Sequence, residues 1–320
     1  MADSLRTFYH WKSRILLHMS GNMRDPLADV VSLLKPAPSI SKLVSGGGRW
    51  IVERSNMGSP FYCAMVVGSC WMTIAGRAPI RLTAGDFVLV PAIFDFSMSS
   101  LEPPTSLARP LPLEVSPGVF RMGSPDAPAE VQALVGHCAF ASRDKDLLVS
   151  LLPEVIHVQG ADRLTALVKM IDDETRSDRA ARDVVLGHLL EVMLIEALRS
   201  TAETAVTPGL LRGLADPQLG LALRQIHANP DHPHSVAALA QAAAMSRSTF
   251  YERFRREIGA APMEYVTTWR MALAKDMLAR KEAPIADIAR RIGYGSASAF
   301  SVAFARHVGA PPGAFAAMRG

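Results

Sequence analysis

Apolar residues recur at helical spacing in two short, neighbouring stretches near the end of the chain. In the second stretch, Phe250, Phe254 and Ile258 fall four residues apart, so they line one face of a helix. Ser246 precedes this helix and is a good N-cap, because its hydroxyl accepts from the first free backbone N–H groups. The first stretch, residues 235–244, is another capped helix only a tight turn away. Together they predict a helix-turn-helix, whose second helix can enter a DNA major groove.

This pattern is repeated further along the chain. Phe300, Phe304 and Val308 match the three apolar residues at an offset of 50, while residues 284–296 match the first helix and turn at an offset of 49. The second turn is therefore one residue longer. Between the copies, residues 262–280 predict one long helix with an apolar stripe of Tyr265, Trp269, Leu273 and Met277. Such a helix can hold two recognition helices in successive major-groove segments, so one chain is expected to read two half-sites.

The first half of the chain has the pattern of strands rather than helices. Short apolar runs, separated by Gly and Pro, lie between Ser39 and Phe140. The clearest runs are residues 49–52, 61–67, 69–74 and 87–90. Evenly spaced short strands of this kind predict an antiparallel barrel or sandwich. A short helix over 25–34 precedes them, with Asp25 as its cap and Pro26 at its first position.

Residues 162–200 are predicted to be helical, and the apolar stripe of their second half covers more than half of the helix. Such a helix must be buried by a partner. That partner is either the chain's own barrel or a second copy of the protein. Residues 201–213, with Thr204, Thr207, Pro208 and Gly209, are predicted to be a linker.

Composition and charge narrow the class of protein. A chain of 320 residues, 49% of them hydrophobic, has the length of about two domains. Residues 218–320 hold 13 Lys and Arg against 7 Asp and Glu, whereas residues 1–217 hold 21 against 23. The basic third suits binding to a polyanion. Three cysteines argue against a disulfide framework, and no apolar run approaches the ~20 residues of a membrane span, so a cytoplasmic protein is expected.

The stretch from Pro217 to Gly320 resembles the DNA-binding domain of AraC-type (AraC/XylS) transcriptional regulators. The motifs that carry the resemblance are residues 245–250, 288–289, 292–294, 300–304 and 309–315. The resemblance implies that the exposed face of each second helix contacts base edges and phosphates. In this chain those positions are Arg247, Ser248, Tyr251, Glu252 and Arg255, then Ser296, Ala297, Ser298, Ser301 and Arg306. Because the second set is mostly small, we expect the first helix to provide most discrimination and the second mainly phosphate contacts.

Residues 24–158 resemble the cupin sensor domains that precede such DNA-binding domains. The resemblance rests on the opening helix and on residues 68–71, 82–91 and 151–158. Many cupins are metal enzymes, whose site needs about three His and a carboxylate. Here residues 39–136 contain no histidine, and Phe61-Tyr62-Cys63 stands where paired histidines would fall. Neither a metal cofactor nor an enzyme activity is therefore expected.

A small-molecule effector in the barrel is expected instead. Tyr62, Trp71 and His137 are candidates to line its pocket, although barrel aromatics more often fill a core. An alternative is sensing of oxidants or metals through Cys63 and Cys138, because the imidazole of His137 beside Cys138 would lower the pKa of the thiol. Against this, buried cysteine usually acts as a small apolar residue.

The expected chain is an α+β multidomain protein with four parts. These are an N-terminal arm or upstream extension (1–24), a cupin-like β-barrel sensor domain (25–158), a helical linker and dimerisation segment (159–213), and an all-α domain with two helix-turn-helix units (214–320). The expected partners are double-stranded promoter DNA, a small-molecule effector, RNA polymerase and a second copy in a homodimer, without contact to a membrane. The effector is expected to shift the packing of the barrel against its helices and thereby control transcription.

Overall fold

The computed structural model of the chain describes residues 25–55, 59–92, 95–104, 111–142, 145–201 and 208–317. The arm predicted for residues 1–24 lies outside the described residues. The chain divides into two compact units. The barrel unit comprises residues 30–216 and 253–260, and the helical unit comprises the described parts of the remainder, residues 25–29, 217–252 and 261–317.

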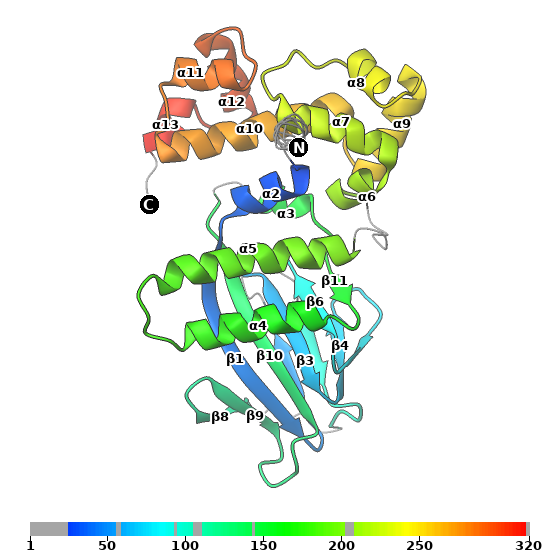
Figure 1. Cartoon of the computed structure of the whole chain (residues 1–320), viewed down its shortest axis with the longest axis vertical. Coiled ribbons are helices and arrows are strands. Elements are labelled where there is room, and N and C mark those ends of the chain that lie inside the picture. The colour runs from blue at the N-terminus through cyan, green and yellow to red at the C-terminus, as the bar shows by residue number, and fades with distance from the viewer. Residues whose placement is uncertain are drawn as a thin grey trace, which may run out of the picture. The chain divides into compact units, whose positions relative to one another are not determined.

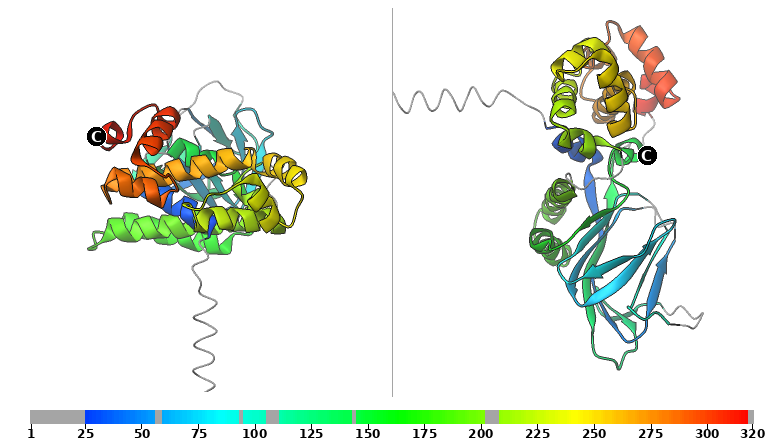
Figure 2. Two further views of the ribbon diagram at one scale, coloured as in Figure 1. Left: turned by 90° about the horizontal axis from the view of Figure 1, so that it is seen from above. Right: turned by 90° about the vertical axis from the view of Figure 1, so that its right-hand side faces the viewer.

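The barrel unit is built on two sheets that face each other (Figure 2, right). The larger has the strand order β11-β6-β3-β10-β1-β9-β8 and the smaller the order β2-β7-β4-β5. Neighbouring strands are antiparallel except β1 and β9, which are parallel. The bounds are β1 Pro36–Gly47, β2 Ile51–Arg54, β3 Phe61–Val67, β4 Ser69–Ile74, β5 Ile80–Thr83, β6 Phe87–Val90, β7 Phe96–Ser99, β8 Leu113–Ser116, β9 Val119–Gly123, β10 Val131–Phe140 and β11 Ile156–Val158.

Three of the four predicted strands, β3, β4 and β6, have the bounds expected from the sequence. The fourth was predicted to begin at Arg49, and this is wrong, because β2 begins at Ile51. The reason is a turn at Gly48, whose φ is +66°, followed by Trp50, whose N–H donates to the Ser100 hydroxyl at 3.0 Å rather than to a strand. The barrel core lies between the sheets and takes alternate residues of most strands, such as Cys63 and Met65 from β3.

Helices α4 (Asp162–Thr175) and α5 (Arg182–Thr201) pack on the other face of the larger sheet, across β1, β3 and β10 (Figure 1). Ser41 on β1 donates to the Asp172 carboxylate on α4 at 3.1 Å. The buried side of α5 includes Leu186, Leu190 and Leu194. The barrel itself therefore covers the inner side of the wide apolar stripe. Helices α3 (Lys145–Ser150) and α6 (Leu210–Ala215) also belong to this unit.

The opening helix α2 (Pro26–Leu34) begins where the sequence predicts. The N–H of Leu27 donates to the Asp25 carboxylate at 3.0 Å, which confirms Asp25 as the cap and Pro26 as the first helical residue.

In the helical unit, two pairs of short helices are joined by one long helix (Figure 1). The pairs have equal lengths, with seven residues in the first helix and twelve in the second. The bounds are α7 Pro217–Ala228, α8 Val236–Ala242, α9 Arg247–Ile258, α10 Pro262–Arg280, α11 Ile285–Arg291, α12 Ala297–Val308 and α13 Pro312–Ala317. The predicted duplication is therefore confirmed in the element order.

The long helix α10 is buried on more than one side. Tyr265 and Trp269 of the predicted stripe are each 2% exposed, and Met271 and Ala274 on other sides are fully buried. The Tyr265 hydroxyl lies 2.8 Å from Nε2 of His227 on α7. A helix buried in this way fixes the elements that pack around it, which is the role expected of residues 262–280.

Candidate DNA-binding surface and sensor cavity

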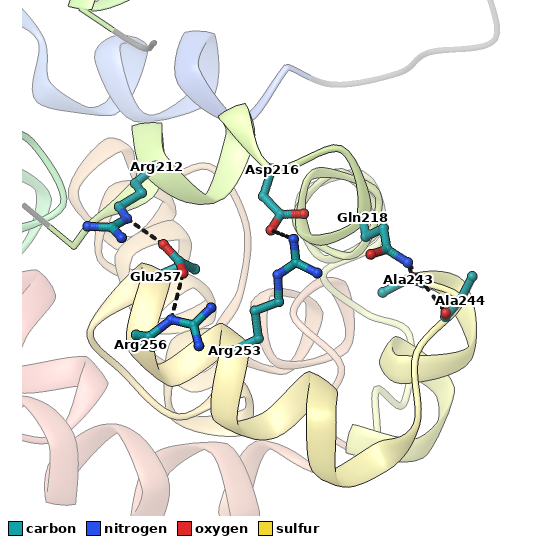
Figure 3. Close-up of polar contacts among 8 residues, drawn as sticks. All are labelled: Arg212, Asp216, Gln218, Ala243, Ala244, Arg253, Arg256 and Glu257. Carbon is teal, nitrogen blue, oxygen red and sulfur yellow. Dashed lines mark hydrogen bonds and ion pairs between the residues drawn. The ribbon is translucent and has the colours of Figure 1, made fainter. Parts of the chain in front are cut away.

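The first helix-turn-helix is closed by a turn in which a non-glycine residue has left-handed backbone geometry. Ala244 has a φ of +51°, and the N–H of Met245 donates to the carbonyl of Ala240 at 2.9 Å. The Gln218 side chain on α7 donates to the carbonyls of Ala243 and Ala244 at 3.0 and 3.4 Å (Figure 3). This side chain satisfies carbonyls that the end of α8 leaves free, and so fixes the turn into α9.

The second turn repeats the first at an offset of 49. Gly293 occupies the left-handed position with a φ of +81°, and the N–H of Tyr294 donates to the carbonyl of Ala289 at 2.8 Å. Gly295 is the additional residue before the second helix. The prediction that the second turn is one residue longer is confirmed.

Both second helices begin at the serine that the sequence indicates. The Ser246 hydroxyl accepts from the N–H of Thr249 at 3.2 Å, and the Ser296 hydroxyl accepts from the N–H of Ala299 at 3.0 Å. Behind the caps, the anchoring phenylalanines are completely buried; they are Phe250, Phe254, Phe300 and Phe304. The two helices therefore have the same inner face, and only the side chains on their outer faces are available to contact DNA.

The outer face of α9 presents every residue that the sequence assigns to DNA contact. The exposed set is Arg247, Ser248, Tyr251, Glu252 and Arg255. Guanidinium groups can donate two hydrogen bonds to guanine or bind phosphate, and carboxylate and hydroxyl groups complement other base edges. The face thus combines donors and acceptors of the kinds that read a major groove.

The outer face of α12 differs from the predicted set. Ser296 uses its hydroxyl oxygen as the helix cap, and the Ser301 hydroxyl is half-buried and donates to the Ala297 carbonyl at 2.7 Å. Ser298 and Arg306 are exposed. Sequence reasoning missed Val302, which is 69% exposed and matches Glu252 at the offset of 50. An exposed apolar side chain at this position is suited to a thymine methyl group.

The last turns of α9 belong to the barrel unit and are fastened to α6 by charged groups (Figure 3). Arg253 lies 2.6 Å from the Asp216 carboxylate. The carboxylate of Glu257 accepts from Nε of Arg256 at 2.8 Å and from Nε of Arg212, and its backbone carbonyl accepts from the N–H of Gly209 at 2.9 Å. Arg253 is therefore occupied within the protein.

Glu257 is 9% exposed, and desolvation alone would raise its pKa. The hydrogen bonds and positive charges of Arg256 and Arg212 outweigh desolvation, so the pKa of Glu257 lies below its usual value. The carboxylate is thus held ionised at the junction of α6 and α9.

The space between the two sheets of the barrel unit contains a cavity of about 50 Å³ that is partly open to solvent. Of the three side chains predicted to line an effector pocket, His137 is the one that lines this cavity among the residues described. Tyr62 and Trp71 do not, because they alternate with the core residues Phe61 and Cys70 and lie on the opposite faces of their strands. Tyr62 instead lies near Asp172 of α4, and its burial raises its pKa.

Comparison with known proteins decides the family. Residues 25–203 match a family model described as cupin, and residues 239–318 match one described as a helix-turn-helix domain. An AraC-like transcription regulator of Streptomyces antibioticus is 38% identical over 297 residues, which cover 90% of this chain and 97% of the relative. The chain belongs to the AraC-type family of transcription regulators.

Two further likenesses are found. An AraC-like transcription regulator of Streptomyces lividans is 36% identical to this AraC-type regulator over 90% of the chain and 97% of the relative. Among solved structures, the DNA-binding domain of AdpA in complex with a target DNA is 31% identical over 32% of this chain and 91% of that one, with a TM-score of 0.30.

The cysteines of this AraC-type regulator are placed as core residues. Cys63, Cys70 and Cys138 are each 0% exposed. Burial raises the pKa of Cys70 and of Cys138 to about 12, and it raises that of Cys63 as well. His137 and Cys138 are neighbours on β10, so their side chains point to opposite faces of the sheet. The expectation that the imidazole lowers the pKa of the Cys138 thiol is wrong for this reason.

Within the described ranges, no group of three or more His, Cys, Asp or Glu side chains is arranged to hold a metal ion. Likewise, none of the helices described is long and apolar enough to span a membrane.

Proposed function

We propose that this regulator reads promoter DNA with the outer faces of α9 and α12, and that an effector bound in the barrel controls that reading. The observation that supports the first part is the contrast between the two sides of each helix. Phe250 and Phe254 are 0% exposed, while Arg247, Tyr251 and Arg255 project to solvent. A short helix with a fixed inner face and a polar outer face is the form that enters a major groove.

The two faces are proposed to do different work. Arg247, Tyr251 and Glu252 on α9 can form directed hydrogen bonds to base edges, which discriminate sequences. On α12, Arg306 can bind phosphate and so position the helix on the DNA. Val302 can contact a thymine methyl, which gives a weak preference for thymine at one base pair. The duplicated α8–α9 and α11–α12 pairs would then occupy two successive major-groove segments.

Selection of bound fragments from random DNA, with the full-length protein, tests this proposal. Arg247→Ala or Tyr251→Ala should relax preference at particular positions by about 1–3 kcal/mol per lost contact. Arg255→Ala should weaken binding to all sequences alike. It should also reduce the slope of the logarithm of the binding constant against the logarithm of the salt concentration by about one. Arg81→Ala, at an exposed position of β5, is the control and should change neither. Unchanged preference in both Arg247→Ala and Tyr251→Ala would refute the assignment of the face.

A homodimer is also proposed, formed through the outer side of α5. Val185 and Val192 are 41% and 44% exposed, and Leu189 and Ile195 beside them are half-buried. These positions recur at helical spacing and form an apolar strip on a helix whose other side packs on the barrel. Light scattering of the full-length protein should show a dimer at micromolar concentration, and Val192→Glu should yield a monomer. A wild-type monomer under those conditions would exclude this interface.

The proposal places the regulator in the cytoplasm, where promoter DNA lies, and it includes contact with RNA polymerase at the promoter. It assigns no enzymatic reaction to the barrel. Sensing of oxidants through Cys63 or Cys138 is the alternative mode of control, and the complete burial of both thiols disfavours it. In a DNA-binding assay, loss of promoter binding on treatment with hydrogen peroxide, absent in Cys63→Ala, would favour the alternative.

A further inference from the structure

Three basic side chains converge at one part of the barrel cavity. Lys42 comes from β1, Arg54 from β2 and His137 from β10, so both sheets contribute. Among the residues that the structure describes, the rest of the lining is aliphatic or aromatic, and the indole of Trp50 adds its one N–H group. The cavity is therefore an apolar space with one cationic region.

The positive charges in this region are not matched by ion pairs: the Lys42 ammonium lies over the Phe120 ring, 4.8 Å from its centroid, and the Arg54 guanidinium donates to the Glu53 carbonyl at 2.9 Å. No described carboxylate forms an ion pair with Lys42 or Arg54, although both side chains are half-buried. The negative charge of Glu114 acts on Lys42 in the opposite sense to burial and to Arg54, and its carboxylate also accepts from the N–H of Gly118 at 3.0 Å.

The cationic groups also act on one another. Burial lowers the pKa of Lys42, and the charge of Arg54 lowers it further. Burial likewise lowers the pKa of His137, with additional contributions from the charges of Lys42 and Arg54, whereas an interaction with the backbone at Pro60 opposes this shift. Like charges that repel in a desolvated place reduce stability unless an anion neutralises them.

His137 provides an independent sign of a missing partner. Its side chain is only 7% exposed, it lines the cavity, and its Nδ1 atom is buried without a hydrogen-bond partner among the described residues. A buried polar atom without a partner costs free energy, and such atoms are rare in folded proteins unless a ligand or water supplies the bond. The imidazole packs against the Phe61 ring in a tilted arrangement, with ring centroids 5.4 Å apart, which holds it at the cavity wall.

We propose that this cavity binds an amphipathic anion, an apolar carboxylate whose charged group lies among Lys42, Arg54 and His137 and whose hydrocarbon part lies against the apolar wall. The carboxylate would accept charge-assisted hydrogen bonds from the ammonium and guanidinium groups and a hydrogen bond from the imidazole N–H. That this anion is also the effector rests on the function proposed above.

Other ligand classes fit the cavity poorly. A metal cation would be repelled by two cations and would find no carboxylate in the described lining. A sugar needs many polar partners, and the described lining offers few, none of which is an amide or an acid. A neutral hydrocarbon would fill the apolar part but would leave the two charges desolvated, at a cost that an anion removes.

Binding of defined compounds to the full-length protein tests the inference. Octanoate, phenylacetate and octyl phosphate would be titrated by calorimetry, with octanamide and octanol as neutral analogues and acetate as an anion without an apolar part. Octanoate or phenylacetate should bind at least about tenfold more tightly than the neutral analogues and than acetate. Arg54→Gln and Lys42→Gln should each weaken that binding by about ten- to hundredfold. The control Arg81→Gln, at an exposed position of β5 outside the cavity lining, should leave it unchanged.

Thermal unfolding without ligand separates a binding role from a structural one. If the cations serve to bind an anion, Lys42→Met should raise the unfolding temperature of the ligand-free protein. The same substitution should abolish the rise in unfolding temperature that octanoate causes in the wild type. If they support the fold, Lys42→Met should lower that temperature, which would overturn the inference. Tighter binding of octyl phosphate than of the carboxylates would likewise overturn the choice of a carboxylate.

DNA binding, measured separately, distinguishes this inference from the proposed function. Failure of every carboxylate to bind, in a protein that still binds its selected DNA, would refute the cavity inference and leave the regulator intact. Binding of a carboxylate that leaves DNA affinity and preference unchanged would confirm the site and refute its role as the effector site.

Discussion

The two helix-turn-helix turns offer a matched pair of substitutions with opposite expected signs. Ala244 and Gly293 occupy equivalent positions with φ values of +51° and +81°. A left-handed conformation costs a residue with a Cβ about 1–2 kcal/mol, which glycine avoids. Glycine also increases the conformational entropy of the unfolded chain, and this offsets about 0.4–1 kcal/mol of the gain. Ala244 is exposed, so its methyl group loses no packing. Ala244→Gly is therefore expected to stabilise the helical unit by about 0.5–1 kcal/mol.

Gly293→Ala introduces the same strain and a steric conflict as well. A Cβ at Gly293 would lie 2.6 Å from a guanidinium nitrogen of Arg270 and 2.7 Å from the backbone carbonyl oxygen of Asp231. The Arg270 guanidinium donates to the carbonyls of Pro230 and His232 at 2.8 and 2.7 Å, so it cannot move without losing a bond. Loss of one charged hydrogen bond costs about 1.5–3 kcal/mol, which brings the expected destabilisation to about 2–4 kcal/mol.

Hydrogen exchange of the full-length protein, followed by mass spectrometry, resolves these changes helix by helix. For Gly293→Ala, the most protected amides of α11 and α12 should exchange about thirtyfold to a thousandfold faster, because each 1.4 kcal/mol is a factor of about ten. Ala244→Gly should slow exchange in α8 and α9. Ala286→Gly, at an exposed and regular helical position of α11, is the control and should cost about 1 kcal/mol. Faster exchange in Ala244→Gly, or no change in Gly293→Ala, would refute the assignment of the turns.

Three further predictions concern a cap, a carboxylate and the thiols. Ser246→Ala, which removes the cap of α9, should cost about 1 kcal/mol in the urea unfolding of the helical unit, and an unchanged midpoint would count against the cap. The pKa of Glu257 is lowered in the folded protein, so the ionised carboxylate stabilises the fold when the pH is above the ordinary pKa of 4.5. This stabilisation is lost as the pH falls through the pKa of the folded state. Glu257→Gln should therefore flatten the dependence of stability on pH between about pH 6 and about pH 3. Iodoacetamide should leave Cys63 and Cys138 unlabelled in the native protein, and rapid labelling would show that the barrel opens.

The helical unit could be predicted almost completely because its signals are local. A serine cap and phenylalanines four residues apart fix the start and the inner face of α9, and the second copy tests each boundary at a constant offset. The element lengths agree in both copies. What the sequence could not give is which small polar residues of α12 remain available, since the Ser301 hydroxyl bonds to its own helix only in the folded structure.

The barrel was predictable as a set of strands but not as a site. The run from Phe61 to Val67 is apolar almost throughout, so alternation along β3 does not show which face lines the cavity, and Tyr62 was assigned to the wrong one. Lys42 and Arg54 meet only because β1 and β2 lie in sheets that face each other. The sequence does place a basic residue and a valine two positions apart at residues 42–44 and again at 52–54. This pattern indicates that each pair shares one face of its strand, but it does not show that the two faces meet unless the strand pairing is known.

The placement of α6 gives the proposed control of DNA reading a specific form. This helix has six residues, too few to be stable alone, and its position depends on buried Leu210 and Leu211 and on the ion pairs of Arg212 and Asp216 with the last turns of α9. A change that reaches α6 therefore acts on α9, whose outer face carries the side chains able to form directed hydrogen bonds with bases. Effector binding should accordingly alter base preference more than it alters overall affinity. Selection from random DNA with and without a bound carboxylate measures this, and a uniform change in affinity across all sequences would show that the signal does not pass through α9.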